Sequence, residues 1–146
     1  MGSSFIDFRG YGFWARDATI EVWLYLLVQE IDRLETKPDW LKETRDHWHI
    51  QATVGFVGWV HPQLDDFLIS QDRINLVMGL CERALKWLNN QGEYLPRNYL
   101  NSLGVGGEGA SWTVDVEVAL FTQTGRKFIE LLRGELKTDA STSPVF

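Results

Sequence analysis

WLKETRDHWHIQATVGFVGWV, residues 40–60, is charged in its first half and apolar in its second half. From residue 50 to residue 60 no side chain is ionisable, and only Gln51 and Thr53 are polar. A helix that is amphipathic at its start and apolar all round at its end passes from the surface of a protein into its interior. We therefore predict that residues 50–60 form the buried centre of a helical bundle.

Gly55 and Gly58 leave a second interpretation of this segment open. Each glycine lowers the intrinsic stability of a helix by about 1 kcal/mol relative to alanine. If the helix continues, the two glycines lie on nearly one side and let another element approach closely, which is the interpretation that we favour. The alternative is that the helix ends near Val54 and that GFVGWV forms a buried turn.

Helical periodicity recurs in the rest of the chain. Asp17 is a candidate N-cap for a helix over residues 17–34, and Ser70 is one for a helix over residues 70–89. A further long helix is predicted over residues 115–136, and short helices follow Pro62 and Pro96. No convincing set of alternating strands is evident. The predicted fold class is all-α, a single-domain helical bundle of about four long and two short helices.

The N-terminal sequence FIDFRGYGFWAR, residues 5–16, is rich in aromatic residues and is interrupted by two glycines. We predict that residues 1–16 form an extended aromatic strap laid over the helices. In the simpler interpretation its rings cap the core and its charges face water. The alternative is a recognition surface, because Tyr, Trp and Arg are enriched at interface hot spots. Its candidate partner-binding residues are Arg9, Tyr11, Trp14, Arg16 and Asp17.

The length of 146 residues fits one domain, which can bury about 70% of its unfolded surface without help from a disulfide or a metal. We predict one helical domain over residues 1–136 and a flexible, polar C-terminal tail over residues 137–146. The single cysteine, Cys81, cannot form an internal disulfide and is interpreted as a small buried hydrophobe.

The charge of the chain restricts its partners. The formal net charge is −6 and the isoelectric point is about 5.0. Nucleic acids and anionic membranes attract basic surfaces, so neither is an expected partner, whereas a basic protein is compatible with this charge. The sequence has no basic segment followed by an apolar run, and its longest apolar stretch is too short to span a membrane. A cytoplasmic location is therefore expected.

The motifs that carry chemistry are weak. Residues 104–109, GVGGEG, match the GxGxxG pattern of dinucleotide-binding loops, but a helical segment precedes them and Glu108 would repel a phosphate. His47 and His49 are two residues apart, which on a helix places them on nearly opposite sides. Ser111 lacks the GxSxG context of a nucleophile elbow. We expect no catalytic residue, no bound metal and no cofactor, and we do not expect enzymatic activity.

These observations favour a non-catalytic protein-binding module. An inhibitor or immunity-type partner of a bacterial toxin would have this size, acidic charge and location. One alternative is a helical protein that binds a small hydrophobic ligand, in a pocket walled by Trp23, Trp48, Phe56 and Trp59. Another is a structural homo-oligomer in which an apolar helix face is exposed on each monomer.

Overall fold

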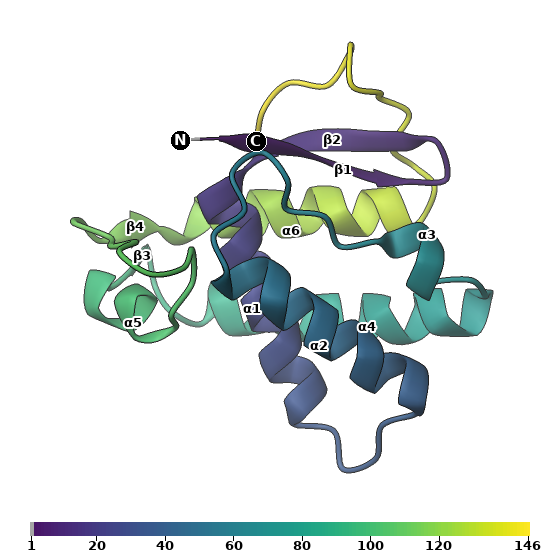
Figure 1. Cartoon of the computed structure of the whole chain (residues 1–146), viewed down its shortest axis with the longest axis horizontal. Coiled ribbons are helices and arrows are strands. Elements are labelled where there is room, and N and C mark those ends of the chain that lie inside the picture. The colour runs from purple at the N-terminus through teal and green to yellow at the C-terminus, as the bar shows by residue number, and fades with distance from the viewer. Residues whose placement is uncertain (1) are drawn as a thin grey trace.

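The computed structural model describes residues 2–146 and contains six helices and two small antiparallel sheets (Figure 1). About 52% of the chain is helical and 12% is strand, so the predicted all-α class is wrong and the fold is mixed α/β. In chain order the elements are β1 (Ser3–Phe8), β2 (Tyr11–Arg16), α1 (Asp17–Asp32), α2 (Asp39–Thr53), α3 (Leu64–Phe67), α4 (Gln71–Asn89), β3 (Tyr94–Leu95), α5 (Arg97–Ser102), β4 (Val116–Glu117) and α6 (Val118–Leu132).

The predicted N-terminal strap is a β-hairpin made of β1 and β2, which packs on α6. Its turn consists of Arg9 and Gly10, both with a positive φ, of 53° and 84°. Two central residues with positive φ form the type I′ turn, whose twist matches that of the flanking strands. Along each strand, buried side chains such as Ile6 and Phe13 alternate with more exposed ones. Gly10 therefore makes a tight turn between two strands and does not merely interrupt a strap.

The C-terminal segment lies beside the outer edge of β2. The backbone N–H groups of Gly12 and Arg16 donate to the carbonyl groups of Thr138 and Phe146, both at 2.9 Å. A strand edge with unpaired backbone groups is a template for unwanted pairing with other chains. The residues for which a flexible tail is predicted thus supply partners to this edge.

Helix α1 is the central helix of the molecule. It contacts α2, α4 and α6, and its only residues that are not buried are Ala18, Tyr25, Gln29 and Asp32. Its periodic apolar face is widened by Val22 and Leu26, which are also buried, so the helix is covered on several sides. The central position that we predicted for residues 50–60 is therefore occupied by α1.

The second half of residues 40–60 is not buried throughout, contrary to the prediction: Gln51, Ala52 and Val60 are buried, but Ile50, Val54, Val57 and Trp59 are exposed. Helix α2 ends at Thr53, and Gly55 follows the C-cap with a φ of 88°. A glycine in this left-handed conformation is a common terminator of helices, because it has no Cβ to clash. The open alternative placed this end correctly, but the following residues form an exposed loop and not a buried turn.

Gly125 of α6 packs closely against side chains of α1 and α4 in the core. A Cβ at this position would lie 2.6 Å from two carbons of the Trp23 ring and 2.9 Å from Leu85 Cδ2. Trp23 is fully buried and has little room to move. We expect Gly125→Ala to lower the free energy of unfolding by about 1–3 kcal/mol through overpacking, as measured by urea denaturation.

The matched control is Gly79→Ala in α4, where a new Cβ would meet no atom within 4 Å. This substitution should stabilise the protein by up to about 1 kcal/mol, because alanine is the better helix former. Equal stability of the two variants would contradict the close packing at Gly125.

Candidate functional site

The candidate site is the loop of residues 54–60, which joins α2 to α3 and is referred to below as the 54–60 loop. In Figure 1 it rises from the end of α2 to the level of the β-hairpin before it descends to α3. Val54, Val57 and Trp59 are 55%, 72% and 78% exposed. Contiguous apolar patches that are exposed to water mark interaction sites, and three large apolar side chains are exposed within six residues here.

A buried carboxylate holds the middle of this loop. The Ser4 hydroxyl donates to Asp17 Oδ1 at 2.6 Å, and the backbone N–H of Gly58 donates to Asp17 Oδ2 at 2.8 Å. Ser4 Oγ in turn accepts the backbone N–H of Val60 at 3.0 Å. Both Ser4 and Asp17 are buried, so these bonds are shielded from competition with water. The loop is thereby tied to β1 and to the first residue of α1.

Side chains of α2 hold the far end of the loop. The backbone N–H of His61 donates to Gln51 Oε1, and Trp48 donates its indole N–H to the carbonyl of Pro62, each at 2.8 Å. Both Gln51 and Trp48 are buried. The segment that follows Trp59 is therefore fixed to the helix that precedes the loop.

A second glycine-rich segment packs against the near end of the loop. The backbone N–H of Gly106 donates to the carbonyl of Ala52 at 2.9 Å. A Cβ on Gly55 would lie 2.5 Å from the carbonyl oxygen of Gly106, so the two backbones are in direct contact. Residues 104–109, which match GxGxxG, lie between α5 and β4 and not at a strand-to-helix turn. The glycines of this segment, Gly106 in particular, allow its backbone to pack directly against that of the 54–60 loop.

Glu21 lies under this crossing, one helical turn after Asp17. It is only 4% exposed, and its Oε2 atom has no hydrogen-bond partner. A Cβ on Gly106 would be 4.0 Å from Glu21 Oε1, which places the carboxyl group beside the glycine-rich segment. Burial, and next the charge of Asp17, raise the pKa of Glu21 to about 8. Glu21 is therefore mainly protonated at pH 7.

The sequence did not single out Glu21. Helical spacing assigns it to the side of α1 opposite the apolar face, where an acidic residue is normally solvated. The two glycine-rich segments cover that side, and their crossing is not visible in a sequence pattern. The one available signal is the spacing of Asp17 and Glu21, two acids four residues apart whose charges repel on a helix.

The predicted partner-binding residues are spread from the hairpin turn along β2 to the start of α1. Arg9 and Tyr11 lie at the hairpin turn, and Arg16 is exposed at the other end of β2. Trp14 is half-buried and donates its indole N–H to a carbonyl of the C-terminal segment at 2.8 Å. Asp17 points inward and acts on the 54–60 loop. A role of these five residues in partner binding stays a prediction.

The four residues proposed to wall a ligand pocket are also dispersed. Trp23 and Trp48 are fully buried, and their ring centroids lie 6.1 Å and 6.4 Å from that of Phe128 in a filled part of the core. Phe56 is half-buried, and Trp59 is on the surface. The four residues therefore have different surroundings, from the filled core to open water, and a shared ligand pocket stays a prediction.

The histidines and the cysteine offer no reactive cluster. Within residues 2–146 no group of three or more His, Cys, Asp or Glu residues is arranged to hold a metal ion. The ring of His47 contacts that of Phe67, whereas the ring of His49 contacts that of Tyr25, so the two imidazoles lie apart. Cys81 is fully buried, and burial raises the pKa of its thiol.

No protein-family model matches the sequence, and no curated protein or solved structure matches it at a significant level. Among residues 2–146, every helix is too short or too polar to cross a lipid bilayer. The function of the chain is therefore inferred from the chemistry of its own residues.

Proposed function

We propose that the protein is a non-catalytic protein-binding module whose interface is centred on the 54–60 loop. The observation that carries this proposal is the 78% exposure of Trp59, next to Val57 at 72%. Burying a tryptophan side chain releases a large apolar area from water. Tryptophan is also among the residues that most often dominate the binding energy of interfaces.

The anchoring of the loop supports the same function. A mobile loop loses conformational freedom when it binds, which weakens the complex. Here the backbone of Gly58 and Val60 is held by Asp17 and Ser4, so most of that ordering has already occurred in the free protein. A fixed display of apolar side chains is what a specific, tight interface requires.

The charge of the chain indicates the kind of partner. The net charge is −6, and the exposed Glu108 belongs to the segment that packs against the loop. The complementary surface on the partner is an apolar pocket for Trp59 with a basic rim. The opposite charges of the two proteins would also accelerate their association. A basic bacterial toxin that is neutralised in the cytoplasm is the form of the proposal that this charge favours. The structural homo-oligomer, the competing hypothesis, would be recognised by its mass in solution.

We expect Trp59→Ala to weaken partner binding at least tenfold, because it removes the most exposed aromatic side chain of the loop. The partner is first isolated from an extract of the native cell with the wild-type chain and identified. The dissociation constant of the purified pair is then measured by calorimetry for each variant. The melting temperature of Trp59→Ala should stay close to that of the wild type, because the side chain is mostly in water.

Ile69→Ala is the matched control, since Ile69 is 65% exposed but lies outside the loop. It should bind as the wild type does. The paired change Tyr11→Ala and Trp14→Ala tests the hairpin as an alternative interface. Wild-type affinity of Trp59→Ala, together with a loss of affinity in the hairpin variant, would move the interface to β2 and refute the loop.

A further inference from the structure

A groove of about 310 Å³ lies between the hairpin turn, α4 and the end of α6. The turn is at the opposite end of the hairpin from the junction of β2 with α1. Its floor is apolar and is formed mainly by Phe8, Leu131, Leu132 and Leu136, all of which are buried. Met78, half-buried on α4, forms one wall. The groove shares no residue with the 54–60 loop, so it is a separate surface.

The rim of this groove is cationic. Arg9, Arg133 and Lys137 line it, and no acidic side chain does, although the chain as a whole has a net charge of −6. Lys137 Nζ lies over the Tyr11 ring at 4.7 Å, and the guanidinium of Arg9 lies over the Phe8 ring at 4.8 Å. These contacts keep both charges near the aromatic side chains of the groove.

The charges on the rim are largely free of carboxylate partners. Among the ion pairs within residues 2–146, none involves Arg9 or Lys137. Arg133 faces Glu82 at 3.5 Å in an exposed pair. Asp65 is close to the turn, but its carboxylate accepts the backbone N–H of Arg9 at 2.9 Å. The side chains of Arg9 and Lys137 are therefore available to bind an anion.

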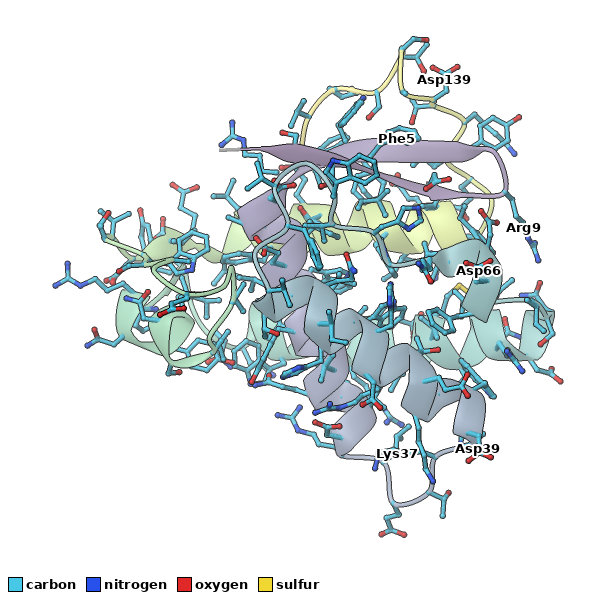
Figure 2. The ribbon with its side chains drawn as sticks, viewed as in Figure 1. Phe5, Arg9, Lys37, Asp39, Asp66 and Asp139 are labelled. Atoms are coloured by element: carbon cyan, nitrogen blue, oxygen red, sulfur yellow. The ribbon has the colours of Figure 1, made fainter. Side chains whose placement is uncertain are left out.

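The backbone of Arg9 points to a use for its side chain. Its φ of 53° places it in the left-handed region, at a turn position where Asn, Asp or Gly is preferred. A long side chain in that conformation is uncommon, and strained residues of this kind cluster at functional sites. Figure 2 shows Arg9 extending from the turn at the edge of the molecule, beyond the strands. A functional role for the guanidinium at the rim would account for an arginine at this turn position.

We propose that the groove binds a small amphiphile that has an apolar chain and one carboxylate group. Its volume is at the lower end of the range for small-molecule sites. The apolar floor removes the chain from water, and guanidinium groups pair with carboxylates through two parallel hydrogen bonds. A neutral chain lacks the second interaction, and a cationic one is repelled by the rim.

Calorimetric titration with decanoate, decanol and decyltrimethylammonium tests the proposal on the full chain. We expect saturable binding of one decanoate per chain, at least tenfold weaker binding of decanol, and no binding of the cation. Equal affinity for decanoate and decanol would overturn the role of the rim. The absence of saturable decanoate binding would overturn the site itself.

Substitutions in the groove test whether decanoate binds there. Arg9→Gly removes the guanidinium and suits the turn, so the fold should keep or raise its melting temperature. This variant and Lys137→Gln should each weaken decanoate binding at least tenfold, and Met78→Trp should block the groove without changing its charge. Lys86→Gln, on the exposed side of α4, is the control for the loss of one positive charge. Unchanged affinity in Arg9→Gly, Lys137→Gln and Met78→Trp would refute the assignment.

Discussion

Replacing Asp17 by alanine is expected to lower the free energy of unfolding by about 3 kcal/mol and to release the 54–60 loop. Asp17 accepts hydrogen bonds from the Ser4 hydroxyl and from the backbone N–H of Gly58, at 2.6 Å and 2.8 Å. Hydrogen bonds to a charged acceptor are worth about 1.5–3 kcal/mol each, and alanine would leave both donors without a partner. The first turn of α1 would also lose a carboxylate that its dipole stabilises.

Two measurements separate the global from the local part of this effect. Urea denaturation gives the loss of stability, and amide hydrogen exchange reports on Gly58 and Val60, whose N–H groups donate to Asp17 and Ser4. We expect both amides to exchange faster in Asp17→Ala than the global destabilisation alone requires. Asp17→Asn, which keeps one acceptor oxygen, should show a smaller change. Unaltered protection at Gly58 would show that the carboxylate does not hold the loop.

The same variant connects the anchoring of the loop to the proposed function. Asp17 is buried in the free protein and its carboxylate is bonded to Ser4 and Gly58, so its expected effect on affinity acts through the loop. If the fixed position of the loop contributes to affinity, Asp17→Ala should weaken partner binding although Trp59 is unchanged.

Local signals predicted the helices well where one residue type determines a helix end. Ser70 is the N-cap of α4, and its hydroxyl accepts the backbone N–H of Arg73, as expected of a serine in that position. Pro38, which precedes the charged start of residues 40–60, is the N-cap residue of α2 and separates it from α1. In these cases the deciding interactions lie within a few residues of each other along the chain.

One physical reason for the errors is that apolar composition does not report on burial. Residues 54–60 are uncharged, but Gly55 ends the helix and the following backbone is drawn to Asp17, 41 residues earlier in the chain. The hairpin was missed because Gly10 and Gly12 outweighed the two-residue alternation around them. The candidate site depends on contacts between distant segments, so neither its anchors nor Glu21 could be located from spacing alone.

Glu21→Gln is expected to remove a large pH dependence from the stability of the protein. The pKa of Glu21 is raised from 4.5 to about 8, chiefly by burial and next by Asp17. Between these two values the unfolded chain has released the proton that the folded chain still holds. The stability that this proton contributes is complete below pH 4.5 and is lost as the pH rises to about 8. The loss between pH 5 and pH 7 is on the order of 2–3 kcal/mol for this group.

The measurement is the difference in unfolding free energy between Glu21→Gln and the wild type at several pH values. Glutamine does not ionise, so its advantage should grow from pH 5 to pH 8 and then level off. Glu108→Gln, which removes an exposed carboxyl group from the neighbouring segment, is the control and should show no such growth. A constant difference across this range would mean that Glu21 is already ionised in the folded protein. Its orphaned Oε2 would then require a cationic partner, and the crossing of the two glycine-rich segments above it would have to be wet.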